Sequence, residues 1–406
     1  MPDPVFPGVY INEAPDSQTI TPSIQSRPLF IAYTPVKAAV NPVLIHSLTE
    51  FDAQFPVPKP ARRIFTEKFG VKKALPVKKI QAAAPVLRDH LELYFANGGG
   101  ACYLFSCGTA EADKQKQHYL DALAALPADD SFDLLVLPDA ADLPTDDYAE
   151  VLNAAVGCAV RLDVFYIADI CRAHAGLTIS AAVSAFRNSV TNMSSLKNTA
   201  VYFPWLKTGG RLVKTLPPSA AIAAVYVQTD QARGIWKAPV NVAIAGITDL
   251  TKRPGASDQD EMNIDTEKGL SVNAIRFFTG KGFLVWGART LAGNDNEWRY
   301  VSVRRLALWI RKSVALSTEW VIFEPNNAST WTKLKGCTEA FLIALWRQGA
   351  FAGAKPGHAF YVRSGLNETM TQADIQNGRL IIEIGIAPVR PAEFIILRIA
   401  FPLFPG

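Results

Sequence analysis

One stretch of the chain, residues 283–326, holds four of its eight tryptophans and constrains the fold more than any other. A short apolar run that ends at Trp286 predicts a buried strand, and Gly287 allows the backbone to turn sharply after it. Between Val303 and Val314 the apolar residues recur at helical spacing, which predicts an amphipathic helix. The run Trp320–Phe323, followed by a proline and two asparagines, predicts a second strand. The stretch is therefore expected to fold as strand, helix and strand.

Composition bounds the size and class of the protein. The 406 residues are 49% hydrophobic and 19% charged, so the chain can bury a large core. At about 100 to 200 residues per domain, we expect two or three domains. The net charge of +4 is small for this length and implies no general attraction to nucleic acid or to a membrane.

The cysteines and the first residues indicate where the protein folds. The five cysteines are scattered and mostly lie in apolar runs, which is typical of reduced core residues and favours a reducing compartment. The start, MPDPVFPG, has neither a basic nor an apolar signal region, and no apolar run approaches about 18 residues. We therefore expect a cytoplasmic protein, or one released by lysis, without stable insertion into a membrane.

The N-terminal residues 1–27 are unlike a domain. Three prolines keep the start extended, Gly8–Glu13 predicts a short strand, and the polar segment Ala14–Arg27 predicts a flexible linker. A short strand on a flexible linker is not stable alone. It must therefore add to a sheet in its own chain or in a neighbour.

Strands and helices alternate from Leu29 to Pro204, which predicts an α/β layer with some parallel pairing. The expected strands are 29–34, 43–48, 102–107, 132–139, 163–170 and 199–204, and the expected helices are 84–97, 110–126, 146–161 and 179–193.

The pattern of the remaining residues, from about 216 onward, predicts a third region whose last elements are strands. A helix rich in small residues is expected over 220–231, and Gly234 breaks it. A second amphipathic helix is expected over 331–348. Strands are expected over 378–385 and 393–399, and the last of these lies so near the terminus that it could leave its own domain.

A basic stretch runs from Lys59 to Lys79 and is opposed only by Glu67. It could bind phosphate groups. Only Phe65 and Phe69 are available there to stack on bases, so an exposed, solvated loop is the favoured interpretation.

The sequence contains no convincing catalytic, cofactor or metal motif. The glycines around Lys281 lack the spacing of a phosphate loop, and those after Asn97 lack the dinucleotide-binding spacing. The five histidines never pair in an H-E-x-x-H pattern, and Cys171 with His174 has no second pair to complete a four-ligand site. We therefore expect no enzyme active site, no cofactor and no metal.

Several other motifs together cover nearly the whole chain. They are Pro7-Gly8-Val9-Tyr10 with Glu13, Phe95–Gly99, and residues 217–241, 272–278, 285–291, 298–306, 323–326 and 387–399. In these motifs the chain resembles the sheath proteins of contractile tails: phage tail sheaths, R-type pyocin-like particles and extracellular contractile injection systems. It departs from that family in Cys102–Cys107, where an arginine-containing strand is usual, and in its final residues Phe401–Gly406.

The resemblance implies a mixed α/β fold with two domains and extended β arms. The expected parts are an N-terminal arm (1–27), an outer domain (28–204), an inner domain facing a tube (205–390) and a C-terminal strand arm (391–406). The arms would add strands to neighbouring subunits. The residues expected to do so are Gly8, Val9, Tyr10, Ile11, Glu393, Phe394, Ile395, Ile396 and Arg398.

The function implied is that of a non-enzymatic structural subunit. Copies of the chain would polymerise helically around an inner tube protein, and the sheath would contract to drive the tube through a target membrane. Baseplate proteins and a tail terminator or cap would be further partners, and the particle would assemble in a bacterial or host-cell cytoplasm. The alternative is a nucleic-acid-binding protein that uses Lys59–Lys79.

Contact with the tube must be weak enough to release, which favours exposed charge over apolar burial. Two surfaces are candidates: the basic stripe of the helix after Val303 and the polar face of the 331–348 helix. For the stripe, an internal salt-bridge face is the alternative. The candidate tube-facing residues are Arg304, Arg305, Arg311, Lys312, Lys333, Lys335 and Glu339.

Overall fold

The structure is a computed structural model that describes residues 19–23, 25–35, 42–56, 86–109, 114–128, 131–193, 195–209, 213–389 and 395–402. Contacts divide the chain into two compact units. One comprises residues 24–309, and the other comprises the described residues among 1–23 and 310–406. The division falls inside one helix, between Trp309 and Ile310.

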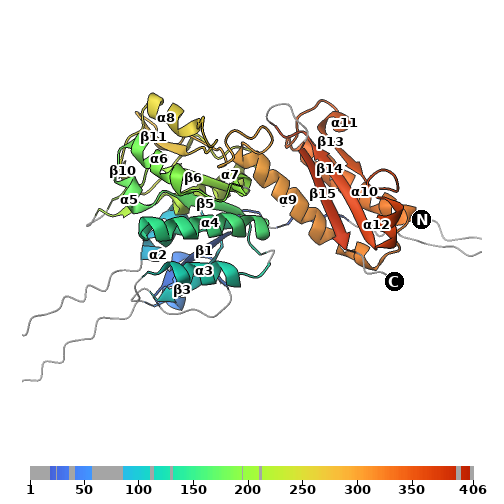
Figure 1. Ribbon diagram of the computed structural model, residues 1–406, viewed down its shortest axis with the longest axis horizontal. Helices are drawn as coiled ribbons and strands as arrows, with labels where there is room; N and C mark the ends of the chain where they lie inside the picture. The colour runs from blue at the N-terminus through green and yellow to red at the C-terminus, as the bar shows by residue number, and fades with distance from the viewer. Residues whose placement is uncertain are drawn as a thin grey trace, which may run out of the picture. The chain divides into compact units, whose positions relative to one another are not determined.

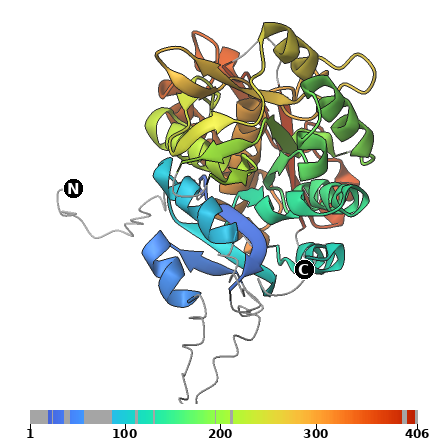
Figure 2. The same ribbon diagram turned by 90° about the vertical axis from the view of Figure 1, so that its left-hand side faces the viewer.

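The unit of residues 24–309 is built on a nine-stranded mixed sheet in the order β2-β3-β1-β4-β5-β6-β11-β12-β9 (Figures 1 and 2). Neighbours from β3 to β11 pair in parallel, and the three remaining strands pair antiparallel at the two edges. The strands are β1 (Pro28–Thr34), β2 (Val43–Ile45), β3 (Cys102–Thr109), β4 (Leu134–Val136), β5 (Phe165–Asp169), β6 (Thr199–Phe203), β9 (Val242–Ala243), β11 (Asn273–Phe278) and β12 (Gly282–Val285). All six strands expected between Leu29 and Pro204 are present, but two of them end earlier than predicted, because Leu48 begins the helix α1 and Pro138 begins a 3-10 helix.

Helices cover both faces of this sheet and create two separate hydrophobic cores. Successive strand residues point to opposite faces, so Leu29 and Ile31 join one core while Phe30 and Ala32 join the other. Burial on both faces explains why the parallel strands read as continuous apolar runs. The helices α3 (Lys116–Ala125), α4 (Thr145–Arg161), α5 (Arg172–Ala175) and α6 (Ile179–Ser189) contribute to the first core, and α1 (Leu48–Gln54), α2 (Val86–Ala96) and α7 (Ser219–Arg233) contribute to the second.

The helix α7 is buried around most of its circumference, from Ser219 to Val227. The small-residue helix predicted over 220–231 is confirmed, and its alanines are all buried except Ala232. The helix ends at Gly234, whose φ of 87° lies in the region that favours glycine and whose N–H donates to Asp230 O.

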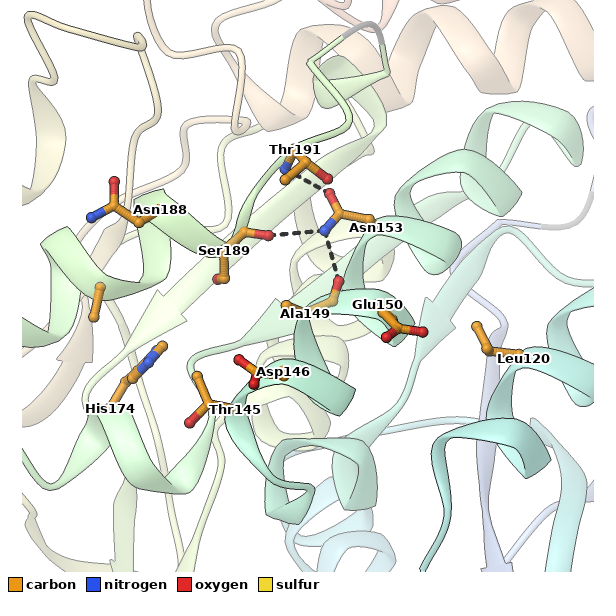
Figure 3. Close-up of a pocket in the computed structure, with 11 residues that line it drawn as sticks. Leu120, Thr145, Asp146, Ala149, Glu150, Asn153, His174, Asn188, Ser189 and Thr191 are labelled. Atoms are coloured by element: carbon orange, nitrogen blue, oxygen red, sulfur yellow. Dashed lines mark hydrogen bonds between the residues drawn. The ribbon is translucent and has the colours of Figure 1, made fainter.

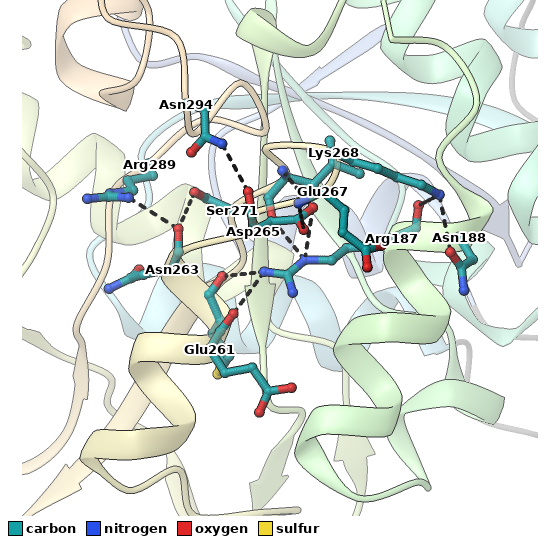
Figure 4. A network of polar contacts seen from close by, with 12 residues as sticks. Arg187, Asn188, Glu261, Asn263, Asp265, Glu267, Lys268, Ser271, Arg289 and Asn294 are labelled. Atoms are coloured by element: carbon teal, nitrogen blue, oxygen red, sulfur yellow. Dashed lines mark hydrogen bonds and ion pairs between the residues drawn. The ribbon is translucent and has the colours of Figure 1, made fainter.

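Two smaller features complete this unit. A three-stranded sheet pairs β7 (Leu206–Thr208) with β8 (Thr215–Leu216) and β10 (Ile247–Leu250). A polar network joins α6 to α8 (Ala256–Asn263) and the loop after it (Figure 4). In this network the Arg187 guanidinium donates to the carbonyls of Leu270, Glu261 and Met262 at 2.9–3.1 Å.

The predicted boundary after residue 204 differs from the observed division. The parallel pairing of β6 with β11 continues the sheet across that point, so residues 205–309 belong to the first unit. Which unit lies inside or outside in an assembly stays a prediction.

The second unit contains the end of α9 (Val301–Ser317), the helix α10 and a three-stranded antiparallel sheet in the order β13-β14-β15. Its remaining elements are η3 (Glu319–Phe323), α10 (Ala328–Arg347), α11 (Pro356–Ala359), β13 (Phe360–Arg363), α12 (Gln372–Gln376), β14 (Arg379–Ile386) and β15 (Ile395–Pro402). The predicted helices near 303–314 and 331–348 and the two terminal strands are confirmed.

The strand predicted at Trp320–Phe323 is wrong, because these residues form the 3-10 helix η3. The Val321 N–H donates to Thr318 O, which continues a helical turn directly after α9. Only Val321 is fully buried, whereas Phe323 is 89% exposed. The apolar run therefore forms a short turn that connects the helices α9 and α10.

Candidate assembly surfaces

The predicted arm strands are only partly described by the structure. Gly8–Ile11, Glu393 and Phe394 lie outside the described residues, as does the basic stretch Lys59–Lys79. Ile395, Ile396 and Arg398 lie in β15, which pairs antiparallel over its whole length with β14 of the same chain. Their contact with a neighbouring subunit stays a prediction.

The described part of the predicted linker, residues 19–23 and 25–27, makes hydrogen bonds to distant residues, and residues 14–18 of that linker lie outside the described residues. The backbone N–H groups of Thr21 and Ser23 donate to the hydroxyls of Ser317 and Ser313 on α9, at 3.0 and 2.9 Å. Further on, the N–H groups of Ser26 and Arg27 donate to the Asp133 carboxylate at 2.8 and 2.6 Å. The acceptors are serines and an aspartate far away in the sequence, so the polar composition of the segment gave no sign of them.

The basic stripe predicted on α9 is divided by burial. Arg304 is 8% exposed, donates to Asn198 Oδ1 at 2.6 Å and lies over the Trp298 ring at 4.4 Å. Arg305 is 2% exposed. Both guanidinium groups are therefore held inside their own unit: Arg304 by an amide oxygen and an aromatic ring, and Arg305 by an internal ion pair with Asp230.

Arg305 is the centre of a buried charged cluster. It donates to both oxygens of Asp230 at 3.2 and 2.5 Å, to Ser26 Oγ at 3.4 Å, and lies 4.7 Å above the Tyr226 ring. Asp133 Oδ2 is 3.8 Å from the same guanidinium. Burial raises the pKa of the Asp133 carboxyl, while Arg305 acts in the opposite direction. The cluster joins the start of β1 to α7 and α9.

The other tube-facing candidates lie on the second unit. Arg311 and Lys333 are exposed, and Lys312, Lys335 and Glu339 are half-buried. The opposite face of α10 buries Leu334, Phe341, Leu342 and Leu345, as the helical pattern predicts. This arrangement leaves the polar face of α10 available to a partner, and its contact with a tube stays a prediction.

Buried ionisable groups lie where parallel strands end, which is the usual ligand position in sheets of this kind. Asp139, Asp169 and His90 are each at most 3% exposed. Tyr33 N–H donates to Asp139, and Ser219 N–H donates to Asp169. Burial raises the pKa of Asp139 to about 6 and that of Asp169 to about 7, and it lowers the pKa of His90 to about 3.

These three side chains are almost fully buried, so none of them is exposed at the surface of the described chain. Neither Asp139 nor Asp169 was predicted from the sequence to be a site residue. The available signal was that two buried strands, FDLLVLPD and DVFYIADI, each reach an aspartate near their carboxyl end.

A surface pocket of about 790 Å³ lies between α4 and α6 (Figure 3). Asn153 joins its two walls: its amide donates to the carbonyls of Ala149 and Ser189, and its Oδ1 accepts from Thr191 N–H. The Ser189 hydroxyl donates to Phe186 O and is engaged locally rather than with His174. The polar lining thus holds helices together.

The described residues contain no group of three or more His, Cys, Asp or Glu side chains that could hold a metal ion. Within the same residues, every helix is too short or too polar to cross a membrane.

Comparison with known proteins places the chain in a family. Residues 112–291 match the phage tail sheath protein central domain, and residues 293–402 match the phage tail sheath C-terminal domain. A solved chain from the anti-feeding prophage helical sheath in its contracted state is 34% identical, with a TM-score of 0.69, and the match covers 96% of this chain and 98% of that one.

The chain belongs to the phage tail sheath family. A second sheath structure, from the PVC extracellular contractile injection system in its contracted state, is 30% identical with a TM-score of 0.69, and the match covers 97% of this chain and 96% of that one. The tail sheath protein of Vibrio phage KVP40 is 22% identical over 184 residues, which are 45% of this chain and 26% of the phage protein. The chain thus spans about a quarter of the length of that curated relative.

Family membership confirms three predictions: the resemblance, the mixed α/β fold and the general function of a structural sheath subunit. The nucleic-acid-binding alternative receives no support from any of these comparisons.

Proposed function

We propose that this sheath-family chain polymerises helically around an inner tube and contracts to drive the tube through a target membrane. The observation that carries the proposal is the match over nearly the full length to a sheath subunit of a contractile particle. The subunit acts without catalysis, and its partners are further copies of itself, a tube protein, baseplate proteins and a terminator or cap. It assembles in the cytoplasm of the producing cell as part of a phage tail or an injection particle.

The two units suit a subunit whose parts must repack without losing connection. Each unit has its own buried residues, so the subunit can keep its internal packing while the interfaces between subunits change. Contraction needs no nucleotide if the final lattice buries more surface than the initial one. A gain of a few hundred Å² of apolar burial per subunit, at about 25 cal/mol per Å², supplies several kcal/mol for each copy.

The terminal strands provide the connections between subunits in this proposal. The strand β15 forms a regular antiparallel ladder with β14, so the same ladder can form with β14 of another copy. The N-terminal segment Gly8–Ile11 would supply a second strand.

Electron microscopy of the purified protein tests the proposal. We expect helical tubes from the full chain and isolated subunits from a chain that lacks residues 1–16. Val9→Pro is the length-matched version of this deletion, because proline removes a ladder hydrogen bond. Tubes that form equally well without residues 1–16 would exclude the arm as the connection, and a full chain that never forms tubes would refute the proposal itself.

The polar face of α10 is our proposed contact with the tube. Lys333 and Lys335 lie there, and Lys333 is exposed. Reversing both to glutamate should reduce the yield of sheath on tubes while sheath polymerisation without tubes continues. The matched control reverses two exposed lysines elsewhere, Lys281 and Lys355, which changes the net charge equally. An equal loss in both variants would assign the effect to net charge.

A further inference from the structure

We infer that the segment before β1 is a two-stage tether for the N-terminal arm, with an outer attachment that opens during contraction and an inner attachment that does not. The inference rests on the proposed function and concerns residues 19–27. The chain between the last attached residue and the arm strand is short when the outer attachment is closed, and it is longer when the outer attachment is open.

The outer attachment is made by two serines one helical turn apart on α9. Ser317 Oγ accepts from Thr21 N–H and donates to Thr21 O, both at 3.0 Å. Ser313 Oγ accepts from Ser23 N–H at 2.9 Å and donates to Ser23 Oγ at 3.1 Å. Each serine hydroxyl thus accepts one hydrogen bond from the segment and donates one to it. A serine in a helix commonly donates instead to the carbonyl four residues earlier in its own helix. All four contacts are neutral, and two of them are solvent-exposed.

The inner attachment is of a different kind. Asp133 accepts from the N–H groups of both Ser26 and Arg27, and Ser26 Oγ donates to Asp230. Arg305 neutralises these carboxylates from within the unit. Hydrogen bonds to charged groups are about twice as strong as neutral ones, and burial protects them from water. Force applied to the arm therefore opens the outer attachment first.

The change in the shape of the sheath during contraction supplies that force. A sheath that shortens without losing volume must widen, and widening increases the spacing between neighbours around its circumference. Opening of the outer attachment moves the last fixed residue from Thr21 to Ser26, which frees a contour length of up to about 16 Å at about 3.3 Å per residue. The strand at the end of the arm can then stay paired with its neighbour while the subunits separate.

The first test measures the attachment in the isolated full-length subunit. Hydrogen exchange should show protected amides at Thr21 and Ser23. In Ser313→Ala/Ser317→Ala this protection should fall by at least tenfold while Ser26 and Arg27 keep theirs. Thr332→Ala is the matched control, because its hydroxyl donates to Ala328 O in its own helix. Unprotected Thr21 and Ser23 amides in the wild-type subunit would refute the outer attachment.

The second test locks the outer attachment in assembled particles. Ser23 Oγ and Ser313 Oγ are 3.1 Å apart, so Ser23→Cys/Ser313→Cys places two sulfurs close to disulfide distance. In particles built with the native partner proteins, we expect the disulfide to form readily in extended sheaths and several-fold less in contracted ones. Oxidised particles should stay extended after triggering, and reductant should restore contraction.

Each outcome of this test decides a specific claim. The single variants Ser23→Cys and Ser313→Cys control for the native cysteines and should contract normally under oxidant. Equal disulfide yields in the two states, or normal contraction of fully locked particles, would refute the two-stage tether while leaving the sheath function intact. If wild-type chains form no sheath at all, both the proposed function and the tether role are refuted. Hydrogen exchange still shows whether the attachment exists in the isolated subunit.

Discussion

Removal of the Arg305 guanidinium should strongly destabilise the unit of residues 24–309. Arg305→Met leaves Asp230, whose side chain is 1% exposed, without its cation, and it removes the charge beside Asp133. Loss of one partner from a buried ion pair costs about 3–5 kcal/mol, because the remaining charge is neither hydrated nor neutralised. The contact with the Tyr226 ring is also lost, which adds to this cost. For a unit of this size we expect the Tm to fall by about 6–15 °C.

A double-mutant cycle separates the ion pair from simple loss of packing. Arg305→Met/Asp230→Leu replaces both charges by apolar groups, and such replacements of whole buried pairs are often nearly neutral. We therefore expect the double variant to be more stable than Arg305→Met alone, with a coupling free energy of about 2 kcal/mol or more. The assay is denaturant unfolding of the isolated subunit, followed by circular dichroism. A cost below about 1 kcal/mol for Arg305→Met, or additive effects of the two changes, would refute the role assigned to the cluster.

Three further changes test other parts of the structure. Because burial raises the pKa of Asp169 to about 7, its contribution to stability is complete below the unfolded pKa near 3.9 and is lost as the pH rises through about 7. In unfolding experiments the free energy of unfolding of Asp169→Asn, relative to wild type, should therefore rise by up to about 4 kcal/mol as the pH increases from about 4 to about 8. A difference that does not change with pH would contradict this assignment. Asn327→Ala removes the N-cap of α10, which accepts from Ser329 N and Thr330 N. It should cost about 1 kcal/mol in thermal unfolding, and an unchanged Tm would rule out a stabilising cap. Gly385→Ala would place its Cβ 2.1 Å from the Tyr361 ring. We expect it to destabilise the β13-β14 pair by about 1–3 kcal/mol in hydrogen exchange, whereas the control Gly336→Ala, which meets nothing within 4 Å, should cost nothing.

Local sequence patterns were sufficient for the long helices and for the strands that are buried on both faces, but the sequence analysis predicted neither the central strand β11 nor several short helices and strands. The strands β1, β4, β5 and β6 were predictable because both faces are buried, so each appears as an apolar run bounded by turn residues. The long helices were predictable from their apolar periodicity. The run at Trp320–Phe323 misled because a short apolar segment has no periodicity that distinguishes a strand from a buried turn.

The sequence by itself determined the α/β character, most element positions and, through motifs spread along the chain, the family. Only the tertiary structure decided which charges are buried and which segments are fixed. Arg305 looks like one of four equivalent cations on α9, yet its partners Asp230 and Ser26 are 75 and 279 positions away in the sequence. The same holds for Thr21 and Ser23, which Ser317 and Ser313 fix from 296 and 290 positions away. Such contacts carry no local signal, because the free energy of a polar side chain depends on the neighbours that the completed fold brings to it.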